Sequence, residues 1–134
     1  MHTIILSNGK YVGNLSNGER HGKGTYYWNS GDRYEGDWKN NKIEGKGIYY
    51  FPSGNRYEGD WKNDAKEGKG KYYWKYGNRY EGDWKNDKME GKGVEYFNDG
   101  SKYEGEYKME NGMVKVLCIM LMEINMKGNG KMVI

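Results

Sequence analysis

The sequence has few of the features that mark secreted or membrane-spanning proteins. Cys118 is the only cysteine, so no disulfide can form within the chain, which favours a reducing compartment. The longest apolar run, residues 116–122, is far shorter than the ~20 residues of a transmembrane helix. Only three consecutive apolar residues precede Ser7, too few for a signal peptide. We therefore expect a cytoplasmic protein whose only attachment to a membrane or the cytoskeleton is peripheral.

Aliphatic residues are also scarce. The chain of 134 residues is 35% hydrophobic but 16% aromatic, with 14 Tyr and 5 Trp. This composition excludes a conventional core of Leu, Ile and Val. It also excludes general disorder, because disordered segments are poor in aromatic residues. The net charge is only +3, without the basic excess of a nucleic-acid-binding surface, so we expect no nucleic-acid partner.

Residues that could form a catalytic, metal or nucleotide site do not come together in this sequence. His2 and His21 are the only histidines, and neither has a partner for a catalytic triad or dyad. The Gly-Lys-Gly triplets lack the spacing of a phosphate-binding loop. Acid pairs such as Glu35 and Asp37 recur in each unit. Equivalent strands of successive hairpins lie about 10 Å apart, with lysines between the acid pairs, which favours solvated ion pairs over a metal site. We predict no enzyme, no cofactor and no metal site.

What the sequence does contain is a repeat. Tyr-Glu-Gly-Asp-Trp-Lys-Asn stands unchanged at residues 34–40, 57–63 and 80–86, and in degraded form at residues 11–17 and 103–109. The first tyrosines of these stretches are always 23 residues apart. A fixed period without slippage indicates one structural unit copied in tandem.

Each unit reads as a β-hairpin. In the unit at residues 34–56, alternation of polar and apolar residues predicts a strand over 34–39, and a second strand follows at about 45–51. Residues 40–43 predict the turn between them. Pro52-Ser53-Gly54 fits a short loop to the next unit, with a left-handed glycine. The units together predict an all-β, elongated and twisted solenoid of antiparallel hairpins, an open meander.

The glycines suggest a register for the hairpin. With Asn41 and Lys42 at the centre of the turn, Trp38 faces Gly45, residue 36 faces residue 47, and residue 34 faces residue 49. A glycine in a strand usually marks a close approach, and we expect the Trp38 indole to lie across it. The same register opposes Asp37 to Lys46, and likewise predicts the pairs Asp60–Lys69 and Asp83–Lys92.

These residues resemble a known family. Tyr-x-Gly-x-Trp, followed by Gly-Lys-Gly at residues 45–47, 68–70 and 91–93, resembles the MORN (membrane occupation and recognition nexus) repeat. The resemblance covers residues 11–108 and implies an elongated, twisted solenoid of stacked hairpins. Two departures stand out: Leu15 replaces Trp, and Glu95 stands where the other units have Tyr. We expect a wetter or less filled groove at Glu95.

The repeat predicts how the chain divides. Residues 1–10 read as a partial unit, followed by units at 11–33, 34–56, 57–79 and 80–102 and the start of a fifth at 103. The array ends at residue 108, and the degenerate tail that follows, residues 109–134, lacks the 23-residue period.

Three readings of this tail are open: a capping unit, an apolar strand at 114–124 that closes the edge, or a frameshifted repeat. Codons rebuilt across residue boundaries after codon 108 spell a further unit that contains Tyr-Glu-Gly-Glu-Trp-Lys. The nucleotide sequence tests the frameshift, and an early stop codon in the alternative frame contradicts it.

Two surfaces are candidate sites. Aromatic residues on one face of the sheet predict a groove for a partner helix or peptide, unless the face packs on itself. The groove candidates are Tyr34, Trp38, Tyr49, Phe51, Tyr57, Trp61, Tyr72, Trp74, Tyr80, Trp84 and Phe97. The resemblance implies acidic phospholipid as an alternative ligand, bound through basic rows, although interleaved acids weaken it. The lipid candidates are Lys39, Lys42, Lys46, Lys62, Lys66 and Lys69.

The leading hypothesis is a non-enzymatic interaction or scaffold module that holds a protein partner at a membrane or cytoskeletal structure. Direct binding of phosphoinositide or phosphatidylserine is the first alternative. The resemblance implies a second, the regulatory repeat segment of a larger lipid kinase or methyltransferase. A homodimer is a further possible assembly.

Overall fold

The computed structural model describes residues 1–110, 113–116, 122–124 and 130–132, with side chains up to residue 107. Every regular element in these ranges is a β-strand. The strands are β1 (His2–Leu6), β2 (Gly9–Ser16), β3 (Glu19–Trp28), β4 (Arg33–Lys39), β5 (Lys42–Tyr50), β6 (Arg56–Lys62), β7 (Ala65–Tyr73), β8 (Arg79–Lys85), β9 (Lys88–Tyr96), β10 (Lys102–Glu110), β11 (Met113–Val116), β12 (Met122–Ile124) and β13 (Gly130–Met132).

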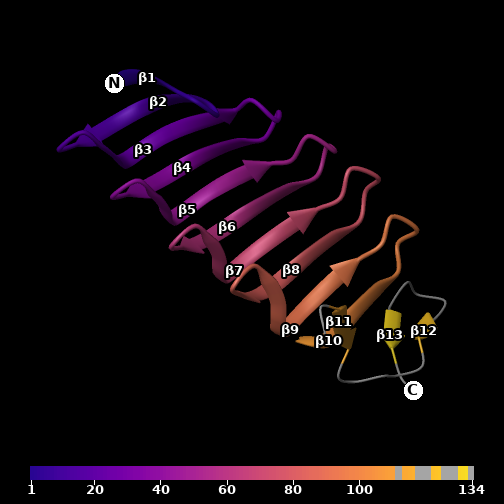
Figure 1. The fold of residues 1–134 in the computed structure, drawn as a ribbon. Helices are drawn as coiled ribbons and strands as arrows, with labels where there is room; N and C mark the ends of the chain where they lie inside the picture. Colours follow the sequence, from indigo (N-terminus) through magenta and orange to yellow (C-terminus); the bar gives the residue numbers. More distant parts are fainter. Residues whose placement is uncertain (111–112, 117–121, 125–129, 133–134) are drawn as a thin grey trace.

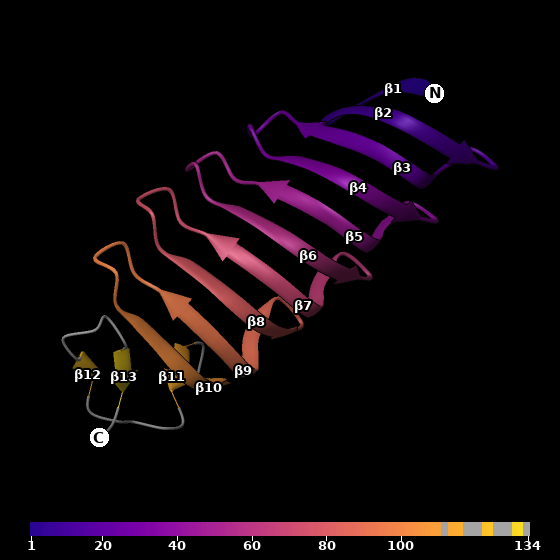
Figure 2. The same ribbon diagram turned by 180° about the vertical axis from the view of Figure 1, so that it is seen from behind.

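The strands β1 to β11 form one antiparallel sheet in which each strand pairs with its neighbours in sequence. Figures 1 and 2 show a single elongated, twisted layer with β1 at one end and β10 near the other. β12 and β13 pair with each other, and β13 lies beside β10 (Figure 1). The predicted all-β open meander of hairpins is confirmed. The frameshift hypothesis falls largely on residues outside the described ranges and stays a prediction, as does the division of the chain.

The hairpin turns are centred one residue earlier than predicted. Asn40 and Asn41 have positive φ angles of 48° and 68°, and β5 already begins at Lys42. Two consecutive left-handed residues form the type of turn whose twist matches paired strands. Asn tolerates this conformation better than Lys, so the prediction of Asn41 and Lys42 at the centre was wrong. Asn63–Asp64 and Asn86–Asp87 repeat the same turn.

The outer half of each hairpin has the predicted register. Tyr34 pairs with Tyr49, and Gly36 pairs with Gly47. The next two units repeat these pairings, except that Glu95 replaces the second tyrosine opposite Tyr80.

A bulge changes the register closer to the turn. Trp38 pairs with Ile43 and not with Gly45, so that Asp37 alone stands opposite residues 44–46. Gly45 has a φ of 102°, a conformation that residues with a side chain rarely adopt. A bulge bends its strand, and here it brings Ile43, which is 4% exposed, into the aromatic core. The predicted pairing of Trp38 with Gly45 was therefore wrong.

The ring that covers the glycine pair is a tyrosine. Tyr34 is fully buried, and a Cβ atom added to Gly47 would overlap its phenol ring. The Tyr34 hydroxyl donates a hydrogen bond of 3.1 Å to the carbonyl oxygen of Asp37. The prediction that the Trp38 indole lies across Gly45 was wrong, because the bulge pairs Trp38 with Ile43 and places the Asp37 side chain next to Gly45. The fully buried tyrosines of the other units are Tyr11, Tyr57 and Tyr80.

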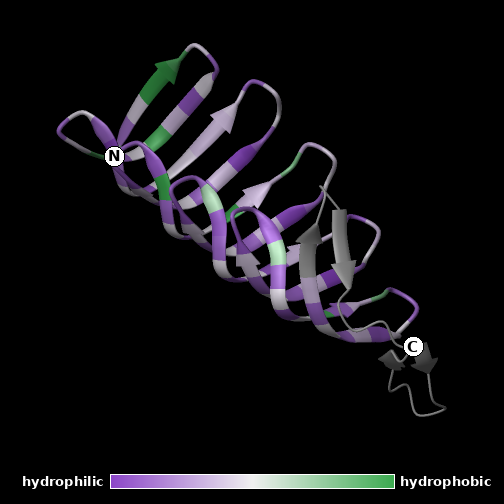
Figure 3. Cartoon of the chain, turned by 60° about the horizontal axis from the view of Figure 1, so that its bottom comes forward, coloured by the Kyte–Doolittle hydropathy of each residue, from purple (hydrophilic) through white to green (hydrophobic). Residues whose placement is uncertain are grey.

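The tryptophans join one unit to the next. Trp61 Nε1 donates a hydrogen bond of 3.2 Å to the carbonyl oxygen of Gly47 in the preceding unit. Its ring also meets Tyr34 of that unit edge-on, with centroids 5.5 Å apart. The core is thus a continuous row of Tyr and Trp rings. The Kyte–Doolittle scale used in Figure 3 gives its highest values to aliphatic residues. Strongly hydrophobic residues on this scale occupy only short stretches of the sheet in Figure 3, which agrees with an aromatic core.

The ion pairs also connect different units. Asp60 pairs with Lys46 of the preceding unit, at 2.6 Å, and not with Lys69 as predicted. Because the bulge sets the Asp60 carboxylate against the backbone, it accepts the Lys69 amide at 3.2 Å instead. Burial disfavours the ionised carboxylate, but these hydrogen bonds outweigh it and hold the pKa of Asp60 below its ordinary value. The same offset holds for the pairs Lys23–Asp37 and Lys69–Asp83.

The hairpin turns bind one another directly. The Asp64 carboxylate accepts the Ile43 amide at 2.8 Å, and the Asp64 amide donates to the Ile43 carbonyl at 3.0 Å. Asn41 and Asp87 hold the turns before them in the same way. Each turn is thereby fixed to the unit that precedes it.

Candidate binding surfaces

The predicted groove residues divide into two groups. Six of them are core residues with at most 7% exposure, and the other five are more exposed. The buried group is Tyr34, Trp38, Tyr57, Trp61, Tyr80 and Trp84. The half-buried group is Tyr49, Phe51, Tyr72, Trp74 and Phe97. A partner on this face would meet the second group, while the first supports it from below.

Four of the half-buried rings form a continuous row, together with one residue absent from the predicted set. The ring centroids of Trp28 and Tyr49 lie 5.5 Å apart, and those of Tyr49 and Phe51 lie 4.7 Å apart. Tyr72 continues the row, with ring centroids 5.7 Å from Phe51 and 4.8 Å from Trp74. We call this row, together with Phe97 at the position 23 residues after Trp74, the aromatic strip: Trp28, Tyr49, Phe51, Tyr72, Trp74 and Phe97. Trp28 lies 23 residues before Phe51, so the repeat alone would have identified it.

The tyrosines of the aromatic strip are held by the loops between units. Tyr49 donates a hydrogen bond of 2.5 Å to the Asp32 carboxylate. Burial, followed by this carboxylate, raises the pKa of Tyr49. Tyr72 accepts a longer hydrogen bond, 3.4 Å, from the Asn55 amide. These hydrogen bonds therefore fix the orientation of the two tyrosine rings.

A cavity of about 360 Å³ lies at the N-terminal end of the aromatic strip. Trp28, Tyr49 and Trp61 line its apolar side. Arg20 and Asp64 are among its polar lining residues. The guanidinium of Arg20 also lies over the Trp38 ring, 5.0 Å from its centroid. Strip and cavity together offer aromatic contact area beside a few polar groups, the usual composition of a polypeptide-binding surface.

Lys66 is a second cation on the aromatic face. It occupies the position of Ile43, and its side chain is only 13% exposed. Its ammonium lies 5.6 Å from the Phe51 ring centroid, 5.7 Å from that of Trp61 and 3.7 Å from the Asp87 carboxylate. Burial lowers the pKa of Lys66, although Asp87 partly opposes this shift. This lysine, a lipid candidate, is therefore not available to a membrane surface.

The other lipid candidates are exposed, and they differ in their pairing. Lys46 and Lys69 project from the sheet but are tied to Asp60 and Asp83. Lys39, Lys42 and Lys62 flank the hairpin turns, and within the described part of the chain they form no ion pair. These three are the lysines that could meet an anionic surface.

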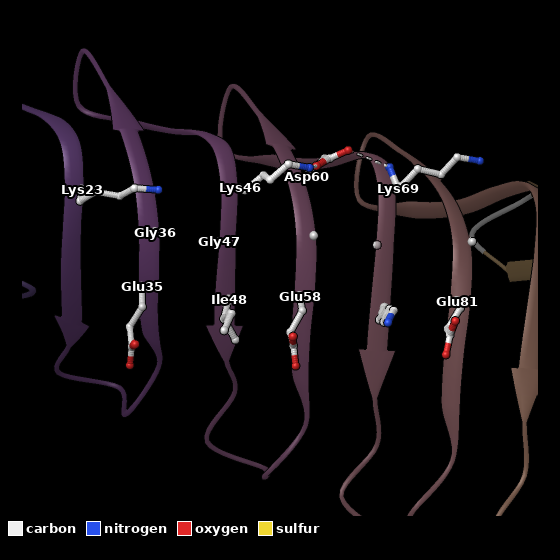
Figure 4. A pocket seen from close by; sticks show the side chains of 14 residues that line it. Lys23, Glu35, Gly36, Lys46, Gly47, Ile48, Glu58, Asp60, Lys69 and Glu81 are labelled. Atoms are coloured by element: carbon white, nitrogen blue, oxygen red, sulfur yellow. Dashed lines mark hydrogen bonds and ion pairs between the residues drawn. The ribbon is translucent and has the colours of Figure 1, made fainter.

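The opposite face of the sheet carries a groove that the sequence analysis did not predict. It has a volume of about 760 Å³, and the backbone of Gly36, Gly47 and neighbouring glycines forms its floor. Figure 4 shows lysines such as Lys46 along one side, and Glu58 and Ile48 along the other. Its alternating acids and bases leave it without a dominant charge.

Among the residues that the structure describes, no group of His, Cys, Asp or Glu could hold a metal ion. Within that same part of the chain, no helix is long and apolar enough to cross a membrane.

Stacked 23-residue hairpins with a shared aromatic core define a repeat protein. Four consecutive stretches match the MORN repeat family: residues 11–33, 34–56, 57–79 and 80–102. The chain therefore belongs to the MORN repeat family, whose members generally take part in protein or membrane interactions. No curated protein sequence gives a significant match.

Proposed function

We propose that this protein is a non-enzymatic interaction module that holds a partner helix or extended peptide on its aromatic strip. The observation that carries the proposal is the unbroken row of half-buried rings from Trp28 to Trp74, with centroids 4.7–5.7 Å apart. A single-layer sheet has no second layer to cover such a row. Aromatic rings contribute large contact area at low entropic cost, and Trp and Tyr dominate binding energy at interfaces.

The rings are also prepared for binding. The Asp32 carboxylate and the Asn55 amide fix two of the tyrosines, and the fully buried core tyrosines support the row. A surface that is already ordered loses little conformational freedom when a partner docks. Equivalent rings recur once per unit, roughly 10 Å apart, so an elongated partner can contact several of them.

The test is a selection of displayed random peptides against the intact chain, followed by affinity measurements on variants. Phe51→Ala and Trp74→Ala should each weaken a selected peptide about tenfold or more. Ile48→Ala is the matched control, because Ile48 lies in the groove of the opposite face. Circular dichroism verifies that each variant is folded. Loss of binding in Ile48→Ala alone would assign the partner to the opposite groove and contradict the proposal.

A second candidate function is recognition of acidic phospholipid by the turn lysines. The observation in its favour is that Lys39, Lys42 and Lys62 are exposed and form no ion pair within the described residues. Co-sedimentation with phosphatidylserine or phosphoinositide vesicles at low salt tests it. Pelleting that disappears in a triple Lys→Gln variant supports this function. A protein that stays in the supernatant at low salt contradicts it.

A further inference from the structure

The aromatic strip is interrupted at one position. Tyr49 lies between Trp28 and Phe51, and Tyr72 lies between Phe51 and Trp74. The next member of this series, 23 residues after Tyr72, is Glu95. Its Cα is paired with those of the core residues Tyr80 and Tyr103, so it belongs to the same face. The strip therefore has a carboxylate where a ring is expected, at the position between Trp74 and Phe97.

Glu95 is a half-buried acid whose charge has little compensation. Its carboxylate accepts a hydrogen bond of 3.1 Å from the Tyr107 hydroxyl. Among the side chains described, none of Lys, Arg or His lies within ion-pair distance of it. Burial raises the pKa of Glu95, and the Tyr107 hydrogen bond only partly offsets this. A carboxylate partly removed from water is usually paired with a cation, and the described side chains supply none to Glu95.

In two other units the repeat supplies a cation to the aromatic face. Arg20 lies over the Tyr26 ring at 5.2 Å, and Lys66 lies over the Phe51 ring at 5.6 Å. The residue equivalent to Lys66 in the unit of Glu95 is Met89. The rings of this face thus accept ammonium and guanidinium groups. The unit that contains Glu95 has no such cation at the equivalent position.

We propose that the position of Glu95 is a subsite for a lysine or arginine side chain of the polypeptide bound on the aromatic strip. The cationic group pairs with the Glu95 carboxylate, and its aliphatic stem lies between Trp74 and Phe97. A cation between aromatic rings and a carboxylate gains both a cation–π contact and a charge-assisted hydrogen bond. An acidic side chain is repelled, and a neutral one leaves the carboxylate unpaired. This inference rests on the proposed function and adds a specificity to it.

The first test uses small probes and does not depend on a partner. Nα-acetyl-lysine N-methylamide should shift the Trp74 indole NMR signal saturably, whereas the norleucine analogue should not. Glu95→Gln should weaken the lysine probe about tenfold or more. Glu104→Gln, an exposed acid on the opposite face, should leave it unchanged. An equal response to norleucine, or an undiminished response in Glu95→Gln, overturns the subsite. A stronger response to tetramethylammonium would overturn the choice of lysine or arginine.

The second test separates the subsite from the proposed function. Glu95→Tyr restores the residue found in the preceding units, so the variant should fold. Peptides selected on the natural chain should be enriched in Lys or Arg at one position, and those selected on Glu95→Tyr should not. Enrichment that persists in Glu95→Tyr contradicts the subsite alone. If no peptide is selected while the lysine probe still binds, the proposed function fails and the cation site stands.

Discussion

The phenol ring of Tyr34 lies directly on Gly47, in space that any Cβ atom at residue 47 would occupy. The same Tyr–Gly relationship joins Tyr57 to Gly70 and Tyr80 to Gly93. This contact explains how a single-layer sheet buries its tyrosines completely: the opposing strand has no side chain at that point. Because the Tyr34 and Tyr57 rings each touch a tryptophan of the next unit, and the Tyr80 ring touches Tyr107 there, the contact transmits stability along the array.

Gly47→Ala should therefore destabilise the protein by more than about 3 kcal/mol, since the new methyl group must displace a fully buried ring. Gly100→Ala is the matched control. Gly100 has a φ of 92° but no atom within 4 Å of an added Cβ, so only the backbone strain of about 1 kcal/mol remains. Urea denaturation followed by tryptophan fluorescence measures both. Equal losses in the two variants would contradict the close packing of Tyr34 on Gly47.

Asp64→Ala should weaken the connection between the second and third hairpin turns. The substitution removes the acceptor of the Ile43 amide and puts Ala in a left-handed conformation, at a cost of about 2 kcal/mol. Asp64→Asn should change the free energy of unfolding by no more than about 0.5 kcal/mol, because Asn41 performs this role in the preceding unit. Chemical denaturation compares the two. A large loss in Asp64→Asn would mean that the charge of Asp64, and not its hydrogen bond, matters.

Lys66→Met should stabilise the protein at neutral pH by on the order of 1 kcal/mol, because Met replaces a buried ammonium. Burial lowers the pKa of Lys66, so the folded chain binds fewer protons than the unfolded chain between that pKa and the ordinary 10.5. The natural chain therefore gains stability as pH rises within this window. The advantage of Lys66→Met should shrink as pH rises from neutral toward 10.5. Lys62→Met, at an exposed position, should show neither effect.

Glu95→Gln tests the electrostatics of the interrupted strip through the pH dependence of stability. Burial raises the pKa of Glu95, so the folded chain keeps this proton to a higher pH than the unfolded chain does. The cost of the ionised carboxylate is present above the folded pKa and disappears as pH falls through it. The variant should be the more stable protein at pH 7, and its advantage should diminish toward acidic pH. A pH-independent difference would show that Glu95 is already compensated.

The repeat period and the strand alternation were sufficient to predict the fold, including the pairing of Tyr34 with Tyr49. The errors arose at the bulge. Nothing in the pattern signals that Asp37 faces three residues, and a uniform register instead places Trp38 opposite Gly45. The glycine there is ambiguous from sequence, because a close approach and a left-handed backbone both require Gly. From this one error followed the wrong covering ring and the wrong partners for the ion pairs.

The sequence predicted which face of the sheet carries the aromatic residues, but not which of these residues are exposed on it. Alternation places Tyr34 and Tyr49 on the same face, yet one is fully buried and the other half-exposed. That difference depends on the bend of the hairpin, which brings Ile43 and Lys66 over the core. The departure at Glu95 was visible in the sequence. Which described side chains come close to the Glu95 carboxylate depends on tertiary packing, which the sequence does not show.

The most direct test of the aromatic strip as a protein-binding surface uses the five tryptophans as reporters. Trp28 and Trp74 belong to the strip, whereas Trp38 and its two equivalents are core residues whose indoles donate to backbone carbonyls. In an NMR cross-saturation experiment with a bound selected peptide, saturation should reach the Trp28 and Trp74 indole protons. Saturation that instead reaches the methyl groups of Ile48 and Val94, on the opposite face, and neither strip indole would contradict the account.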